Sequence, residues 1–192
     1  MLISFVICLF SSVVSNANDV QNTTDKFIRL HVIANSDSER DQEIKLTVRD
    51  AVLSEADALL KGCESKENAI AVINDNLEGF TNAANEALDN CGYTAVCSLE
   101  KTTFDKRVYD DFSLPAGVYD SLLVKLGSAS GKNWWCVCYP ELCLPSAVRL
   151  EECKSLSEND VMILKNPEKV RYKLFCFELI RKIKSIFVDQ SK

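Results

Sequence analysis

The chain of 192 residues has one histidine, four prolines and six glycines. One imidazole offers few nitrogen ligands, and the nine cysteines do not follow the CxxC…CxxC spacing of zinc sites. The few glycines form neither a phosphate-binding loop with its lysine nor the G-x-S-x-G turn of serine hydrolases. The sequence therefore predicts no metal site, no cofactor and no recognisable catalytic residue.

Positive charge and long apolar runs are also scarce. Lys and Arg total 22 against 28 Asp and Glu, so the net charge is -6. An acidic chain has no general attraction for nucleic acid, and no nucleic-acid partner is expected. After the N-terminus no apolar run reaches the ~20 residues of a membrane span, which excludes a polytopic membrane protein. The remaining composition, 47% hydrophobic and 26% charged, is that of a globular protein.

The N-terminus resembles a secretory signal peptide. Leu2–Val14 is almost wholly apolar, and Ser15-Asn16-Ala17 has the small-x-small form of a cleavage site. No Lys or Arg precedes the apolar stretch, which departs from the usual pattern. We interpret residues 1–17 as an export segment and expect a secreted protein; the alternative is a buried N-terminal strand or helix.

The pattern after this segment predicts an α+β domain over residues 25–150. Phe27–Ala34 reads as a strand with one apolar and one half-polar face, followed by two or three helices between Glu39 and Cys91. The first of these should end at Lys61, and Gly79 should divide the second from the third. Further strands are expected in a mainly antiparallel sheet, over 93–100, 104–109, 118–126 and 133–139. We expect Gly127–Gly131 to close a hairpin between the last two.

Residues 151–192 form a tail in which basic and apolar residues mix. From Lys165 onward there are eight basic and three acidic residues, a local charge of +5. Val170–Val188 reads as a C-terminal helix with apolar residues nearly all the way round. Such a helix could pack on the sheet or lie on an anionic membrane surface.

Several polar or aromatic side chains stand out from the apolar pattern. Arg29 and His31 share the half-polar face of the first strand, and adjacent Trp134 and Trp135 must point to opposite sides of theirs. Lys45 and Arg49 fall inside the apolar arc of the first helix. They indicate either an internal salt bridge, for example to Asp37 or Asp41, or a polar cluster at the strand–helix junction.

Three ordered motifs resemble the stage II sporulation protein R family, over about residues 27–146. The first opens at FIRLHVIANSDS, and the others contain LPAG and GKNWWC. Their residues are Phe27–Ser38 with Asp41, Gln42, Lys45 and Val48–Val52; Leu114–Gly117 with Tyr119; and Gly131–Cys136 with Pro140, Leu142 and Cys143.

The resemblance implies a secreted signalling protein of endospore formation. Members are made in the forespore and exported into the space between its membrane and that of the mother cell. There they are required to activate a membrane-embedded aspartic protease, the sigma-E processing peptidase, which cleaves a sigma-factor precursor. The expected role is that of an activator and not an enzyme. Two other classes stay open: an exported hydrolase using His31 with a nearby carboxylate, and a structural module held by disulfides.

The contact residues are chosen from the polar side chains that cluster beside the otherwise apolar first strand and first helix, and from the adjacent tryptophans. Cys136 and Cys143 match cysteines of the family, and they could form a disulfide or stay reduced. The basic tail could hold the activator at the membrane surface near the extracytoplasmic face of the protease. The side chains predicted to bind the partner are Arg29, His31, Asn35, Asp37, Arg49, Asp50, Trp134 and Trp135.

Overall fold

The computed structural model describes residues 20–109, 112–140, 149–153 and 155–166. Within them the chain forms six strands, the four α-helices α2 to α5, a helical stretch at residues 20–24 and one short 3-10 helix. In chain order the elements are β1 (Ile28–Ile33), α2 (Glu39–Leu60), α3 (Lys66–Asp75), α4 (Leu77–Ala87), β2 (Ala95–Phe104), β3 (Arg107–Val108), β4 (Ser113–Leu114), β5 (Gly117–Leu126), β6 (Asn133–Tyr139), η1 (Leu150–Glu152) and α5 (Glu158–Lys165).

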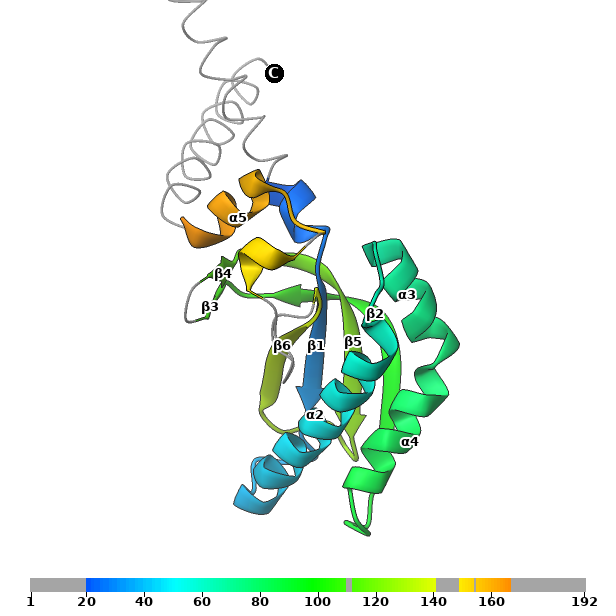
Figure 1. Ribbon diagram of the computed structural model, residues 1–192. Helices are drawn as coiled ribbons and strands as arrows, with labels where there is room; N and C mark the ends of the chain where they lie inside the picture. The colour runs from blue at the N-terminus through cyan, green and yellow to red at the C-terminus, as the bar shows by residue number, and fades with distance from the viewer. Residues whose placement is uncertain (1–19, 110–111, 141–148, 154, 167–192) are drawn as a thin grey trace, which may run out of the picture. The chain divides into compact units, whose positions relative to one another are not determined.

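The main sheet has four strands in the order β2-β5-β1-β6 (Figure 1). β5 is antiparallel to β2, and β6 is antiparallel to β1, whereas the central pair β1–β5 is parallel. The predicted α+β class is confirmed, with a mostly antiparallel sheet, helices after the first strand and a C-terminal helix.

The predicted hairpin between residues 118–126 and 133–139 is wrong. β1 lies between β5 and β6, so Val32 pairs with Val124 on one side and with Trp134 on the other. The loop from Gly127 crosses the end of β1 instead of turning back on itself, and the Gly131 amide donates to the Ala34 carbonyl at 2.9 Å. A central β1 explains why its backbone finds partners on both sides.

Helix and strand limits differ from the prediction at three places. The first helix ends at Leu60. The break between the second and third helices falls at Asn76 and not at Gly79. The Asn76 side-chain amide donates to the Val72 carbonyl at 2.8 Å. Residues 95–104 form one continuous strand, β2, because β5 pairs with it over that whole length.

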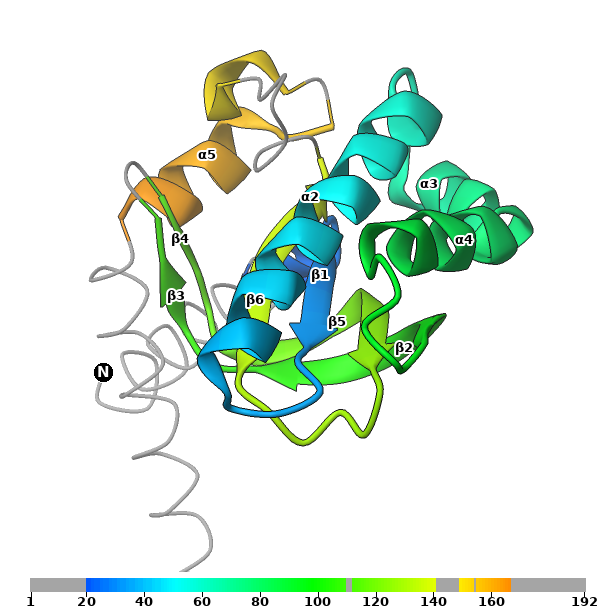
Figure 2. The same cartoon turned by 90° about the horizontal axis from the view of Figure 1, so that it is seen from below.

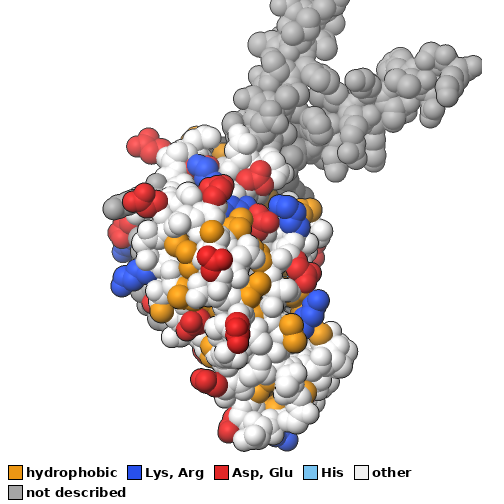
Figure 3. Space-filling model, turned by 90° about the vertical axis from the view of Figure 1, so that its right-hand side faces the viewer, with side chains coloured by type: hydrophobic (Ala, Val, Ile, Leu, Met, Phe, Trp, Pro, Cys, Tyr) orange, Lys and Arg blue, Asp and Glu red, His pale blue; other side chains and the backbone are white. Residues whose placement is uncertain are grey.

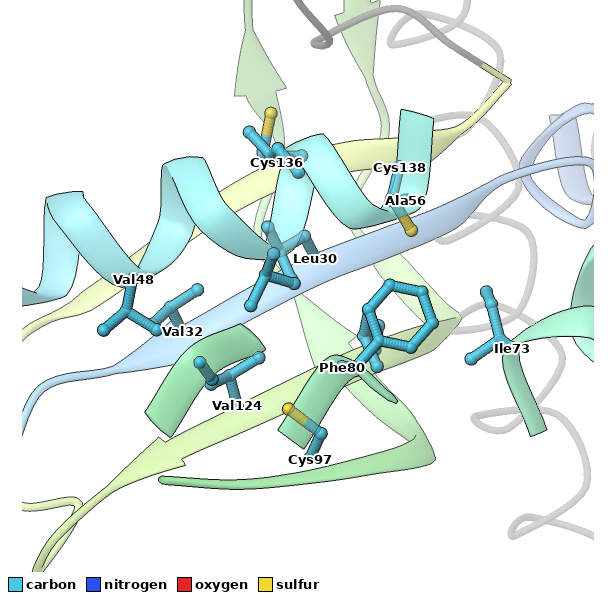
Figure 4. Packing of buried hydrophobic residues seen from close by; sticks show 14 of the residues in the cluster. Leu30, Val32, Val48, Ala56, Ile73, Phe80, Cys97, Val124, Cys136 and Cys138 are labelled. Carbon is cyan, nitrogen blue, oxygen red and sulfur yellow. The ribbon is translucent and has the colours of Figure 1, made fainter. Parts of the chain in front are cut away.

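The three helices after β1 gather on one face of the sheet (Figure 2). The Ser38 hydroxyl accepts the Asp41 amide and so caps the start of α2. The core between helices and sheet includes Val48, Leu30 and Phe80, all fully buried (Figure 4). Burying each large apolar side chain stabilises the fold by about 1.5–3 kcal/mol, so this layer fixes the position of β1.

The described chain divides into two compact units. One holds the four-stranded sheet with α2, α3 and α4 and comprises residues 25–104 and 117–156. In the other, β3 pairs with β4, and the Thr23 hydroxyl donates to Asp160 of α5 at 2.8 Å. Ser157 and Asp160 form a capping box that begins α5. The expected basic helix over 170–188 lies outside the described residues, and among the described helices none is long and apolar enough to span a membrane.

Candidate functional site

Arg29 and His31 lie in an aromatic cage on the sheet face opposite the helices. The Arg29 guanidinium carbon sits 3.9 Å from the centre of the Phe104 ring and 5.2 Å from that of Tyr119. The His31 ring centre is 5.9 Å from those of both Phe104 and Trp135. Arg29 is fully buried and His31 is 8% exposed. The cage therefore holds a buried cation by its contacts with π-faces.

The surroundings of His31 favour its neutral form. Burial is the largest cause that lowers its pKa, and the positive charges of Arg29 and Lys125 act in the same direction, while the side chain of Asn133 opposes them. The charged groups that shift this pKa are thus both cations. A general base held by a carboxylate would have the opposite environment.

Mild acid is expected to destabilise the fold through His31. Its folded pKa lies below the ordinary value of 6.5, so between the two values the unfolded chain binds more protons. The free energy of unfolding should therefore decrease as the pH falls below 6.5, and in His31→Gln this decrease should be smaller. Melting temperatures from about pH 8 to about pH 5 measure the effect. Identical slopes for the two proteins would contradict the assignment.

A second group of polar side chains joins the end of β1 to the loop between β5 and β6. The Asn35 Oδ1 atom accepts the Ser128 amide at 2.9 Å, and the Asp37 carboxylate accepts the Lys132 amide at 2.7 Å. The hydroxyls of Ser128 and Ser130 both donate to the Asn35 carbonyl at 2.7 Å. We call these residues, together with Asp41, the junction.

Asp41 is the centre of the junction. Its carboxylate accepts hydrogen bonds from the Ser36 hydroxyl at 2.5 Å, the Tyr93 hydroxyl at 2.8 Å and the Asn35 amide at 3.0 Å. These bonds favour the charged form and lower the pKa of Asp41 to about 2. Burial and the bond to Asp41 raise the pKa of Tyr93, so its phenol stays a donor. The donors of Ser36, Tyr93 and Asn35 and the acceptor oxygens of Asp41 thus satisfy one another, which is the arrangement of a structural carboxylate.

Protonation of Asp41 should destabilise the junction at a lower pH than the pH at which protonation of His31 destabilises the fold. The folded pKa of Asp41, about 2, lies below the ordinary value of 3.8, so this carboxylate contributes stability that is complete above 3.8. That stability should be lost as the pH falls through about 2. Asp41→Asn should lower the melting temperature at neutral pH and flatten the acid limb, whereas Glu39→Gln, exposed in the same turn, should do neither. Matching acid limbs for Asp41→Asn and the parent would refute this role.

Arg49, Asp50 and Trp134 form a third group, on the outer side of α2 and β6. Arg49 pairs with Asp50 at 2.7 Å, and its guanidinium carbon lies 4.5 Å from the centre of the Trp134 ring. The Asp50 side chain is 65% exposed. We call this set the outer patch. Among described residues no ion pair joins Lys45 to an acid; its ammonium donates to Gln42 Oε1 at 2.6 Å and to the Lys132 carbonyl at 3.1 Å.

Comparison with known proteins identifies the family. The family model described as stage II sporulation protein R matches residues 24–149. The chain is also 37% identical to the stage II sporulation protein R of Bacillus subtilis (strain 168) over 141 residues, which cover 70% of this chain. The chain belongs to the stage II sporulation protein R family. Family membership assigns it a role in sporulation.

The match to the Bacillus subtilis protein has a limited extent. It covers 63% of the length of that stage II sporulation protein R. No solved structure gives a significant match to the chain. The sheet, the cage and the junction are therefore described from the structure of this chain and not by comparison with a solved structure.

In this stage II sporulation protein R family member, the predicted contact residues fall at three places. The cage contains Arg29, His31 and Trp135, the junction contains Asn35 and Asp37, and the outer patch contains the rest. In the outer patch Asp50 is exposed and Arg49 and Trp134 are half-buried, so a partner can reach it without unfolding. Asp37 of the junction is exposed as well. Sequence reasoning missed the roles of Ser128, Tyr93 and Phe104, whose types carry no signal until the strands are assembled.

The cysteines that the structure describes belong to core packing or to half-buried positions. Cys136 points into the layer between helices and sheet (Figure 4). Cys143 lies outside the described residues, so the disulfide with Cys136 stays a prediction. Burial raises the pKa of the Cys97 thiol to about 11, which makes this sulfur a poor nucleophile. Among described residues no group of three or more His, Cys, Asp or Glu could hold a metal ion.

Proposed function

We propose that the chain is an exported signalling protein that activates the membrane-embedded aspartic protease responsible for processing the sigma-E precursor. It would act in the space between forespore and mother cell, at the extracytoplasmic face of the protease. The observation that carries the proposal is the family match over residues 24–149. The likeness of the first residues to a signal peptide agrees with export.

The surroundings of His31 favour an activator over the alternative of a hydrolase. A hydrolase built on His31 needs an accessible imidazole with a carboxylate to orient it. Here the ring is 8% exposed, it lies against Phe104 and Trp135, and Arg29 and Lys125 act on its pKa. A purified chain is therefore expected to show no hydrolytic turnover that His31→Ala removes.

Activation requires the chain to bind the active form of the protease more tightly than the inactive form. Equal affinity for both forms would shift nothing, and a shift from 1:99 to 99:1 needs a preference of about 10⁴-fold. A rigid contact surface favours such discrimination because little ordering is needed on binding. The basic tail could add membrane attraction of about 1 kcal/mol for each well-placed Lys or Arg.

Co-expression tests the proposal directly. The chain, the candidate protease and the sigma-E precursor are produced together, and precursor cleavage is compared with and without the chain. Cleavage that depends on the chain supports the activator role. Cleavage that is equal when the chain is absent would exclude it, provided that the protease itself is active.

The outer patch is the part of the predicted contact set that a partner can reach most easily. Arg49→Glu should reduce precursor cleavage by about ten-fold, which corresponds to a loss of about 1.4 kcal/mol in binding. The pair with Asp50, whose side chain is 65% exposed, and the contact with the Trp134 ring each contribute about 1 kcal/mol or less to folding, so the melting temperature should fall only slightly. Arg40→Glu, in the exposed first turn of the same helix, is the matched control and should keep full signalling. Unchanged signalling by a folded Arg49→Glu protein would remove Arg49 from the contact set.

A further inference from the structure

The outer edge of β2 is capped along only part of its length. The Ala95 backbone amide donates to Asn85 Oδ1 at 2.8 Å, and the Ala95 carbonyl accepts the Asn85 side-chain amide at 3.0 Å. The Cys97 amide donates to the Thr81 hydroxyl at 3.3 Å. Asn85 and Thr81 of α4 thus take the place of a neighbouring strand. These bonds also show that the odd-numbered residues of β2 turn their backbone groups away from β5.

The same alternation continues to the end of the strand. β2 pairs with β5 from Ala95 to Phe104 without a register break, so the backbones of Leu99, Lys101 and Thr103 also face outward. No hydrogen bond from a described residue caps their outward amides. Lys101 is 73% exposed and Thr103 is exposed. We call these three positions the open edge. Such an edge is a template for an added strand.

The surface beside the open edge is apolar at its base, and the exposed charges of the α3–α4 side are mostly acidic, whereas Lys101 is the exposed cation of the edge itself. Leu99 and Leu77, at the start of α4, are partly buried hydrophobic residues packed against the core. Carboxylates are spread over the side of the molecule that carries α3 and α4 (Figure 3). Between residues 61 and 92 one exposed cation, Lys61, stands against six exposed acids: Glu64, Glu67, Asp75, Glu78, Glu86 and Asp89. This charge favours a segment with basic and apolar residues.

A second copy of the chain is a poor occupant. Two open edges that pair about a two-fold axis place Lys101 opposite Lys101, or Glu100 opposite Glu100, in the central registers. Like charges directly opposite each other destabilise an antiparallel pair. The charges of β2 thus disfavour self-association, as is common for exposed edges, and leave the edge available to a different chain.

We infer that the open edge binds an extended, basic and apolar segment of the partner protein by β-strand addition. The backbone of Leu99, Lys101 and Thr103 supplies the hydrogen bonds, and Leu77 with Leu99 supplies an apolar contact for alternate side chains. The inference rests on the proposed function only in naming the protease as the partner. Because β2 is paired with β5 over its whole length, its edge is already extended before binding, which favours affinity.

Replacing one backbone amide separates strand addition from side-chain contact. Lys101→Pro removes the outward N–H, whereas Lys101→Ala keeps it; both remove the ion pair with Asp120. Pro is tolerated where an edge amide faces solvent. In the full chain, co-expressed with protease and precursor, Lys101→Pro should give about ten-fold less cleavage than Lys101→Ala. Equal cleavage by the two folded variants would overturn the inference. If Lys101→Pro fails to fold, Thr103→Pro against Thr103→Ala replaces it.

Amide exchange keeps this test distinct from the test of the proposed function. The wild-type chain is mixed with vesicles that contain the protease and, as a control, with empty vesicles. The amides of Leu99, Lys101 and Thr103 should gain protection from exchange with the vesicles that contain the protease and not with the empty vesicles. If the chain does not stimulate cleavage, the proposed function fails, and exchange still decides the edge: protection supports strand addition, and unchanged exchange overturns it.

Discussion

Gly131→Ala is expected to lower the free energy of unfolding by about 3 kcal/mol, which is at the upper end of the cost of overpacking. A Cβ atom at this position would lie 2.3 Å from the Ser36 carbonyl oxygen and 2.9 Å from the Ala34 Cβ atom. The Ser36 carbonyl cannot move away freely because it accepts the Gln42 side-chain amide at 2.8 Å. The clash is therefore with fixed backbone and must push the loop between β5 and β6 away from the connection between β1 and α2.

Chemical denaturation of Gly131→Ala and Gly117→Ala measures this effect. At Gly117 the added Cβ would meet the Tyr119 ring at 3.6 Å, an ordinary contact, so its cost should stay below about 1 kcal/mol. Signalling by Gly131→Ala should fall with the folded fraction. Equal stability of the two variants would mean that the loop and the β1–α2 connection are not held together as the structure shows.

The sequence allowed the class of fold to be predicted because β1 carries a clear period. Ile28, Leu30 and Val32 alternate with Arg29 and His31, and this two-residue period decides which side meets the helices. The neighbours of β1 could not be predicted in the same way. The loop Gly127–Gly131 suits a hairpin locally. β1 nevertheless lies between β5 and β6, where its backbone finds hydrogen-bond partners on both sides.

The sequence indicated polar residues at the end of β1 and the start of α2, but it did not indicate which distant residues they would contact. Asn35, Asp37 and Asp41 are close in sequence, so a polar junction could be expected there. Ser128 is 93 residues away from Asn35 and joins it only through the order of the strands. Arg29 and Arg49 looked alike as charges beside apolar residues. Arg29 is buried between aromatic rings because it points from β1 to the sheet face away from the helices, whereas Arg49 lies on the outer patch because it belongs to α2.

Arg29→Ala should lower the free energy of unfolding by about 3 kcal/mol, within the range for truncating a large buried side chain. Arg29 is fully buried, and its removal would leave a cavity beneath the rings of Phe104 and Tyr119. Arg29→Met should recover a large part of the loss, because an unbranched apolar chain fills the same space. Denaturation curves of both variants and of the parent provide the measurement.

The same pair of variants decides whether the Arg29 guanidinium contacts the partner or only stabilises the fold. If the cage is structural, precursor cleavage should follow the folded fraction, so Arg29→Met should signal nearly as well as the parent at a temperature where both are folded. Arg49→Glu should show the opposite combination, with stability kept and signalling lost. A stable Arg29→Met protein that does not signal would instead make the Arg29 guanidinium a partner contact, and the cage would then have to open on binding.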